Sequence, residues 1–349
     1  MSQATLVDVT IIGGGPAGLY AAFYSGLRGM STKIIEFQPE LGGKLHVYQE
    51  KMIWDIGGVT PAPAAEMIRR LVEQGMTFNP EVVLNEKVTS IEKDGEGNFV
   101  LTSATGAKHY SRTVILAVGG GILKPQKVEI EGAERFEVSN LHYTVKSLQH
   151  FKGKRVLISG GGNAAIDWAN ELEPIAKEVI LTYRKCDLNG HEAQVQQLLQ
   201  SNVVCHFNTR IDKLIASDDH HTIEKVELKH CLEESGLTLE VDDVVINHGY
   251  EVDTSLIGGS EAKLKLTNDH RIAGTPMSGT SVSGIFAAGD VLFHESKVNL
   301  IAGAFQDAAN AVNSAKMYLD PKASQAGMVS SHNEVFKERN KKLVEQLIG

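Results

Sequence analysis

The sequence has few of the residues that define disulfide-bonded, membrane-spanning or nucleic-acid-binding proteins. Its 349 residues include three cysteines, Cys186, Cys205 and Cys231, which are too scattered for a disulfide framework. We therefore expect a reducing, cytoplasmic setting. No long apolar run predicts a membrane span, and residues 1–10 lack the pattern of a secretory signal. The net charge of −9 argues against nucleic-acid binding.

What the sequence does contain is an alternation of strand and helix signals that occurs twice. Each occurrence is a short β-branched run that ends in glycines, then a helical pattern, then a second strand, at 7–37 and at 156–183. A βαβ unit needs about 30 residues, which is the length of each segment. We predict an α/β fold with two Rossmann-like, three-layer dinucleotide-binding domains.

The segments between these units indicate that one domain interrupts the other. Residues 88–118 resemble a small antiparallel meander, and the runs 113–121 and 244–250 are strands that lead into glycine. Both runs are candidate linkers and hinges. The predicted boundaries are 1–118 and 250–349 for the first domain, with a C-terminal extension at 321–349, and 119–249 for the second.

The first glycine motif has the pattern and context of a dinucleotide-binding loop. Gly13, Gly15 and Gly18 form G-x-G-x-x-G between a strand and a helix, and Pro16 suits the first helical position. Glu36 ends the next strand, where a carboxylate accepts hydrogen bonds from a ribose. The alternative is a glycine-rich turn without a ligand, which the correctly spaced acid disfavours.

The second motif is the G-x-G-x-x-A variant, formed by Gly160, Gly162 and Ala165. Its second strand is followed by Arg184 and Lys185 instead of an acid. A guanidinium there can pair with a 2′-phosphate, which favours NADPH over NADH. The alternative is that both cations belong to a solvated loop.

A third element lies near the end of the chain. The short apolar strand 285–288 leads to Gly289 and Asp290, which we expect at the start of a helix. Asp290 could accept hydrogen bonds from sugar hydroxyls near the positive end of that helix. Taken alone, an ordinary strand-to-helix turn with an Asp cap is the favoured interpretation.

These three elements, in this order, resemble the two-dinucleotide-binding-domain flavoprotein disulfide reductases, and the short length resembles the thioredoxin reductase branch. The resemblance covers nearly the whole chain. It implies that FAD binds at Gly13, Gly15, Gly18, Glu36 and Asp290. It implies that NADPH binds at Gly160, Gly162, Ala165 and Arg184, with Lys185 beside them.

The sequence departs from thioredoxin reductase because residues 138–146 contain no Cys-x-x-Cys. It is instead similar to ferredoxin (flavodoxin)–NADP+ reductases of the thioredoxin-reductase-like type. That resemblance implies that Tyr48 stacks on one face of the flavin and His332 covers the other, with no acid or base residue needed. A packing tyrosine and a solvated histidine are the alternatives. The remaining FAD contacts that it implies are Ala17, Lys44, Val88, Leu123 and Ser331.

The family resemblance implies a hydride exchange between nicotinamide C4 and FAD N5, followed by electron exchange with ferredoxin or flavodoxin. A basic patch would dock such acidic carriers, and the C-terminal lysines could provide it or could line an exposed amphipathic helix. We expect a homodimer, no metal site, and no partnership with nucleic acid or membrane. The candidate docking residues are Arg69, Arg70, Lys337, Arg339, Lys341 and Lys342.

Other functions remain open from the sequence alone. One is an NAD(P)H reductase of the same fold that acts on quinones, dyes or the disulfide of a partner protein. Another is a non-catalytic redox sensor, which the two intact glycine motifs disfavour. A membrane-associated quinone reductase is disfavoured because the C-terminal segment is not clearly apolar.

Overall fold

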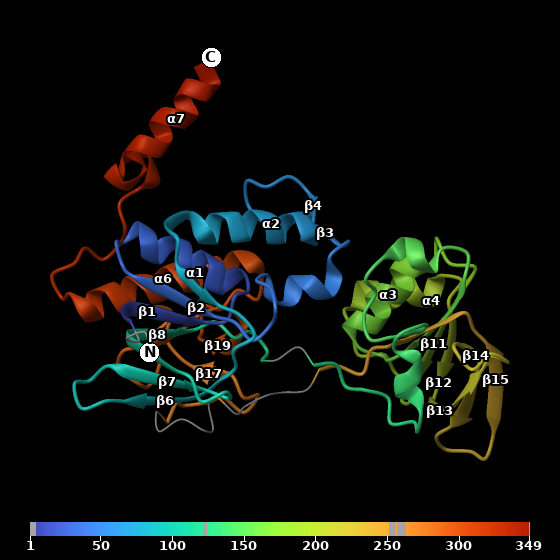
Figure 1. The fold of residues 1–349 in the computed structure, drawn as a ribbon. Coiled ribbons are helices and arrows are strands. Elements are labelled where there is room, and N and C mark those ends of the chain that lie inside the picture. Colours follow the sequence, from blue (N-terminus) through green and yellow to red (C-terminus); the bar gives the residue numbers. More distant parts are fainter. Residues whose placement is uncertain (1–4, 122–123, 251–255, 257–262, 349) are drawn as a thin grey trace. The chain divides into compact units, whose positions relative to one another are not determined.

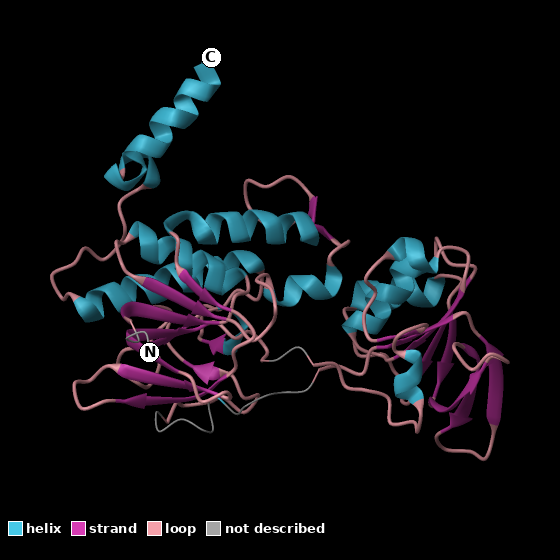
Figure 2. Ribbon diagram, in the orientation of Figure 1, coloured by secondary structure: helices cyan, strands magenta, loops and turns pink. Residues whose placement is uncertain are grey.

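The computed structural model describes residues 5–121, 124–250, 256 and 263–348. The chain divides into two compact units, each with its own sheet (Figures 1 and 2). The first unit is made of Met1–His46, Lys51–Ile122 and Val252–Gly349, and the second of Val47–Glu50 and Leu123–Glu251. No helix in the described ranges has both the length and the apolar character required to cross a bilayer.

The first unit is built on a seven-stranded sheet with the order β5-β2-β1-β8-β7-β6, in which β18 also pairs with β8. Strands β5, β2, β1, β8 and β18 are parallel, while β6 and β7 form the predicted antiparallel meander with β8. The strands are β1 Leu6–Ile12, β2 Thr32–Ile35, β5 Glu81–Val83, β6 Val88–Lys93, β7 Phe99–Ser103, β8 Lys108–Leu116 and β18 Ile285–Ala287.

Three helices gather on one side of the parallel strands, and the β6–β7 hairpin lies on the other (Figure 1). They are α1 Pro16–Leu27, α2 Ala64–Gly75 and α6 Ile301–Leu319. Helix α1 packs against both of the others. Phe99 and Leu101 of β7 are fully buried in a core that also contains Ile285 of β18. Apolar side chains therefore cover both faces of the central strands, as a three-layer fold requires.

The second unit has a five-stranded parallel sheet with the order β12-β11-β10-β16-β9. Its residues alternate between two cores: Val156 and Ile158 pack toward the helices, whereas Leu157 packs toward the opposite face. Burial on both faces explains why these strands are almost continuously apolar. The elements are β9 Leu141–His142, β10 Arg155–Ser159, β11 Glu178–Tyr183, β12 Val204–Phe207, β16 Asp243–Ile246, α3 Asn163–Leu172 and α4 Glu192–Gln200.

An antiparallel sheet covers the face of the second unit opposite to its helices. It consists of β13 Thr209–Ala216, β14 Ile223–His230 and β15 Gly236–Glu240. On β14, Val226 and Leu228 point into the shared core, while Lys225, Glu227 and Lys229 are partly or fully exposed. Sequence reasoning did not predict this sheet, although the alternation of buried and exposed residues is a signal of period two.

One predicted feature is wrong. The sequence suggested a helix start at Asp290, but Gly289–Val291 form a single 3₁₀ turn, η5, and α6 begins only at Ile301. Between them β19 Leu292–Phe293 pairs with β17 Ile272–Ala273. A strand of this length cannot be inferred from its residues alone, because its pairing partner lies elsewhere in the chain.

The remaining elements lie at the periphery. A two-stranded ribbon is formed by β3 Met52–Ile53 and β4 Ala62–Pro63, and the C-terminal helix is α7 Lys337–Ile348. The two tryptophans occupy opposite environments, because Trp54 in the first unit is 75% exposed and Trp168 on α3 is 3% exposed.

Candidate functional site

Four neighbouring parallel strands in the first unit end at the same level of the sheet. Ile12 of β1 pairs with Ile35 of β2 and with Leu116 of β8, which also pairs with Ala287 of β18. In open α/β sheets, ligands bind at this edge where the strand order reverses. The residues that follow the four strands are Gly13, Glu36, Ala117 and Ala288.

Two glycines of the first motif are required by the packing of the chain itself. A Cβ atom on Gly13 would lie 2.4 Å from the carbonyl oxygen of Ala117, and its φ of +108° disfavours any other residue. A Cβ atom on Gly18 would lie 1.9 Å from the carbonyl oxygen of Gly13. These glycines bring the start of α1 close to the strand.

Gly15 is different because no atom of the described residues comes close enough to require a glycine there. Its φ is −76°, and the nearest atom to a built Cβ is the Cα of Gly43, at 3.7 Å. No side chain caps the N-terminus of α1, which starts at Pro16 as predicted. The open space therefore lies in front of a helix N-terminus, where backbone N–H groups bind phosphate. This arrangement fits the diphosphate of a dinucleotide.

Glu36 is held rigidly beside this space. The residue is 7% exposed, and its carboxylate accepts hydrogen bonds from the backbone N–H groups of Gly14 at 2.6 Å and Gln38 at 2.7 Å. Each carboxylate oxygen has more than one lone pair and can accept a further hydrogen bond. The geometry fits recognition of a ribose diol.

The third predicted element lies next to the first. A Cβ atom on Gly289 would be 3.0 Å from the Cβ of Ala17, so η5 contacts the first turn of α1. The side chain of Asp290 is exposed. Sequence segments that are far apart, at 13–18, 36 and 289–290, are therefore brought together at one edge of the sheet.

A buried charged cluster lies behind η5, and sequence reasoning missed it. Asp307 of α6 accepts hydrogen bonds from the Gly289 backbone N–H and from His294, each at 3.1 Å, and forms an ion pair with Lys297. The side chains of Asp307, His294 and Lys297 are each about 5% exposed. Lys297 also donates to the Gly289 carbonyl at 2.6 Å. No spacing in the sequence signals this cluster, because a loop separates its residues.

The second unit repeats the arrangement of the first. Ser159 of β10 pairs with Thr182 of β11 and Ile246 of β16, so Gly160 begins the loop at the common edge. A Cβ atom on Gly160 would lie 2.5 Å from the Asn247 carbonyl oxygen, so packing requires this glycine.

Gly162 corresponds to Gly15 in this second loop. The nearest atom to a built Cβ is 4.0 Å away, and its φ is −94°. It precedes α3, whose N-terminus has no side-chain cap. Ala165, which replaces the third glycine, is fully buried. The space in front of α3 therefore also fits a diphosphate.

The predicted phosphate-binding cations lie at the same edge. Arg184 and Lys185 directly follow β11 and are exposed. His248 is a site residue that sequence reasoning missed; it follows β16 and hydrogen bonds to the Ser159 hydroxyl at 2.9 Å. Burial lowers the pKa of His248, and the nearby charge of Arg184 lowers it further. The imidazole is thus kept neutral beside a cation.

The other predicted flavin contacts are distributed over several elements. Lys44 is exposed in the 3₁₀ helix η1 Gly43–Tyr48, and Tyr48 is half-buried against the apolar core of the second unit. Val88 packs into the core of the first unit, so only its backbone can contact a ligand. Leu123 lies outside the described residues.

Ser331 and His332 lie in the short 3₁₀ helix η6, Ser330–His332, and both are exposed. The preceding segment is anchored at the end of α1, where the Gly327 backbone N–H donates to the Tyr24 hydroxyl at 3.1 Å. Gly15 caps the opposite end of this helix, which is about 18 Å long. The extension is therefore attached far from the glycine loop of its own chain.

None of the three cysteines forms a disulfide. Cys186 and Cys231 are exposed and Cys205 is half-buried. Burial raises the pKa of Cys205, and a hydrogen bond to Asp187 raises that of Cys186. Both thiols are thus poor nucleophiles.

The chain belongs to the pyridine nucleotide-disulphide oxidoreductase family, whose sequence pattern matches residues 7–315. Two similar relatives carry a more particular name. "Ferredoxin--NADP reductase 2" of Exiguobacterium sibiricum is 63% identical over 349 residues, covering 100% of this chain and 99% of the relative. "Ferredoxin--NADP reductase 1" of Bacillus licheniformis is 64% identical over 347 residues, covering 99% of each chain.

Solved structures agree on the fold. The thioredoxin reductase of T. acidophilum has a TM-score of 0.73 at 24% identity, with 91% of this chain and 99% of that chain covered. The thioredoxin reductase of Lactococcus lactis has a TM-score of 0.73 at 22% identity, with 90% and 99% covered. The predicted α/β fold with two dinucleotide-binding Rossmann-like domains is thus confirmed.

Proposed function

We propose that this chain is an FAD-dependent enzyme that exchanges electrons between NADPH and a ferredoxin or flavodoxin. The observation that carries the proposal is the pair of glycines, Gly15 and Gly162, that the chain's own packing does not require. Each leaves room for a diphosphate in front of an uncapped helix. The names of relatives that are 63% and 64% identical support the same activity.

The residues of the first unit are assigned to FAD. The α1 N-terminus binds the diphosphate, Glu36 accepts from the adenosine ribose, and Asp290 accepts from hydroxyls of the flavin chain. Ala17, Lys44, Val88 and Leu123 are further proposed FAD contacts, and Ser331, which is next to His332 in the C-terminal extension, is assigned together with it. FAD, when bound, takes up a hydride at N5 and releases electrons singly, so no protein acid or base is required.

The residues of the second unit are assigned to NADPH. Gly160, Gly162 and Ala165 allow the diphosphate to approach α3, while Arg184 and Lys185 pair with the 2′-phosphate by charge-assisted hydrogen bonds. Both cations are exposed, so they remain accessible to a charged ligand. The neutral His248 beside Arg184 avoids adding repulsion between two cations.

The absence of a cysteine pair decides what the reduced flavin reacts with. Because all three cysteines are free, no disulfide of this chain would relay electrons between a bound FAD and the carrier. Tyr48 and His332 are the residues proposed to stack on the flavin. Because the extension is anchored at the far end of α1, we assign His332 to the flavin of a second copy in a homodimer. The cytoplasmic location remains part of this proposal.

The docking surface for an acidic carrier is proposed at the C-terminal helix. Arg69 and Arg70 form ion pairs with Glu66, which partly neutralises them. Lys341 and Lys342 of α7 are exposed. Their charges attract an acidic carrier from a distance, and this attraction weakens as salt increases.

Anaerobic stopped-flow absorbance of the yellow protein tests the proposal. NADPH should bleach the flavin rapidly, NADH should do so weakly, and oxidised ferredoxin should restore the colour. Arg184→Gln should raise the Kd for NADPH about 10- to 100-fold, as expected for one charged hydrogen-bond partner, with little change for NADH. Exposed Arg210→Gln is the matched control.

Two outcomes would contradict parts of the proposal. If bleaching is rapid but no electrons reach ferredoxin or flavodoxin, the acceptor is a quinone, a dye or a partner's disulfide. If the purified protein is colourless and binds no flavin, it is a non-catalytic nucleotide-binding protein.

A further inference from the structure

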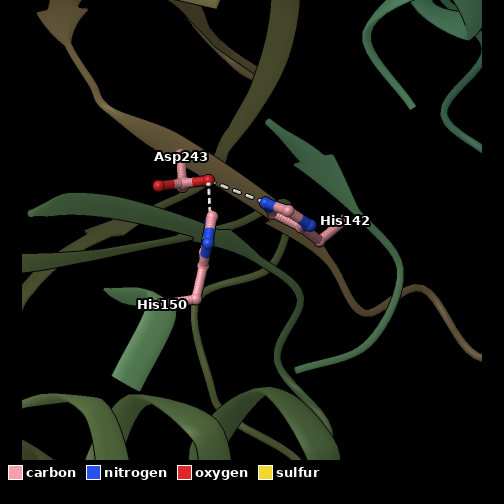
Figure 3. A group of neighbouring side chains, drawn as sticks. All are labelled: His142, His150 and Asp243. Atoms are coloured by element: carbon pink, nitrogen blue, oxygen red, sulfur yellow. Dashed lines mark hydrogen bonds and ion pairs between the residues drawn. The ribbon is translucent and has the colours of Figure 1, made fainter. Parts of the chain in front are cut away.

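Two histidines and an aspartate converge at the edge of the second unit opposite to its glycine loop. His142 belongs to β9, Asp243 is the first residue of β16, and His150 lies in the 3₁₀ helix Leu148–Phe151 (Figure 3). The Asp243 side chain is fully buried, whereas the side chains of His142 and His150 are 22% and 42% exposed. Solvent therefore reaches the group from the histidine side.

The ring nitrogens of both histidines point at the same carboxylate oxygen. Nε2 of His142 lies 2.7 Å and Nε2 of His150 lies 2.9 Å from Oδ1 of Asp243 (Figure 3). Lys154 bonds the other oxygen, Oδ2, at 2.9 Å. Three potential ligand atoms, two nitrogens and one oxygen, thus lie within 4.8 Å of one another.

The hydrogen bonding around His150 contains a conflict. Its Nε2 lies 3.1 Å from the ammonium of Lys154, which can only donate a hydrogen bond, so Nε2 must act as the acceptor. The same nitrogen must donate toward the Asp243 carboxylate, because an ionised carboxylate can only accept. Lys154 also donates to the other oxygen of the same carboxylate. The Nε2 atom of His150 thus faces both an ammonium and a carboxylate, and one nitrogen cannot satisfy both neighbours.

We propose that His142, His150 and Asp243 bind one divalent transition-metal ion, with Zn²⁺ as the best chemical match. Two imidazoles and a carboxylate form a common three-residue zinc ligand set, in which water takes the fourth position. A cation between the two Nε2 atoms and Oδ1 also removes the hydrogen-bonding conflict at His150. Lys154 keeps its bond to Oδ2.

The geometry requires only a small adjustment. Tetrahedral ligands at about 2.0 Å from zinc are about 3.3 Å apart, while the nitrogen–oxygen separations here are 2.7 and 2.9 Å. Both histidine nitrogens must therefore move away from Oδ1, by about 0.6 Å for His142 and about 0.4 Å for His150. Both rings pack edge-on against Phe151, at centroid distances of 5.3 Å for His142 and 4.8 Å for His150. This packing limits the orientations that the rings can adopt.

The location separates the metal from the proposed nucleotide site. Lys154 precedes β10 and Gly160 follows it, and five residues of a strand span about 17 Å. The ion would connect strands β9 and β16 to the 3₁₀ helix Leu148–Phe151, so its effect would be to stabilise the second unit. The proposal stands independently of the proposed electron-transfer function.

Cobalt titration of the chelator-treated, FAD-loaded protein tests the site. Tetrahedral Co²⁺ absorbs at longer wavelengths than oxidised flavin, and we expect one saturable equivalent per chain that Zn²⁺ displaces. His150→Gln and His142→Gln should each weaken Co²⁺ binding at least tenfold, while exposed His221→Gln should leave it unchanged. Circular dichroism verifies that each variant is folded.

Lys154→Met provides a test in the opposite direction. Removing a cation beside the ligands should strengthen Co²⁺ binding, which a merely structural cluster would not predict. Zn²⁺ should raise the thermal midpoint of the second unit in the wild type and not in His150→Gln. The proposal is overturned if no saturable band forms, or if His142→Gln and His150→Gln bind as tightly as His221→Gln.

Discussion

At the scale of single residues, the two kinds of glycine in the first loop make a direct prediction. Gly15→Ala should fold with an unchanged thermal midpoint as apoprotein, since its Cβ meets nothing closer than 3.7 Å, but it should lose FAD affinity. Gly18→Ala should destabilise the apoprotein itself, because its Cβ would lie 1.9 Å from a carbonyl oxygen. Flavin absorbance and apoprotein melting separate the two effects, and equal destabilisation would contradict the distinction.

His248 predicts a dependence of stability on pH. Its pKa is lowered in the folded state, so as pH falls below about 6.5 the unfolded chain takes up a proton that the folded chain resists. This residue's contribution to the free energy of unfolding therefore decreases with falling pH, until the folded pKa is reached. His248→Gln should remove this contribution to the change of the free energy of unfolding with pH, measured by urea unfolding between pH 5 and 7.5. Exposed His221→Gln should keep the wild-type slope.

At the scale of elements, α6 supports η5 through a buried ion pair. Lys297→Met should destabilise the apoprotein by about 3–5 kcal/mol, because it leaves the carboxylate of Asp307 buried without a cation. Lys337→Met removes an exposed ion pair with Glu334 and should change stability by less than about 1 kcal/mol. Urea unfolding measures both, and similar losses would mean that the buried pair contributes no more than the surface pair.

The elements that could be predicted from the sequence are those with a local signal. The two βαβ units were predicted because each glycine loop fixes where a strand ends and a helix begins. The helix expected at Asp290 was wrong, since the intervening turn and β19 depend on pairing with β17, which is distant in sequence. The Asp307 cluster and His248 were missed for the same reason, because tertiary contacts bring their partners together.

At the scale of the whole molecule, the two units have separate hydrophobic cores. The core around Phe99 and Leu101 draws on the first unit, and those around Ile158 and Leu157 draw on the second. Calorimetry should therefore resolve two unfolding transitions. FAD should raise the midpoint temperature of the first unit, and NADP+ should raise that of the second unit. At a hundredfold excess over Kd, each ligand adds about 2.7 kcal/mol to the free energy of unfolding of the unit that binds it. A single transition that shifts with both ligands would mean that the units unfold together.

The two tryptophans make these events observable by intrinsic fluorescence. Trp168 is buried in the second unit and Trp54 is largely exposed in the first. A buried indole emits at shorter wavelength than a solvated one, so the blue edge of the spectrum reports on the second unit alone. The red shift of the Trp168 emission therefore follows the rate at which the second unit unfolds, without any added label. In Trp168→Phe, Trp54 would be the only emitting tryptophan.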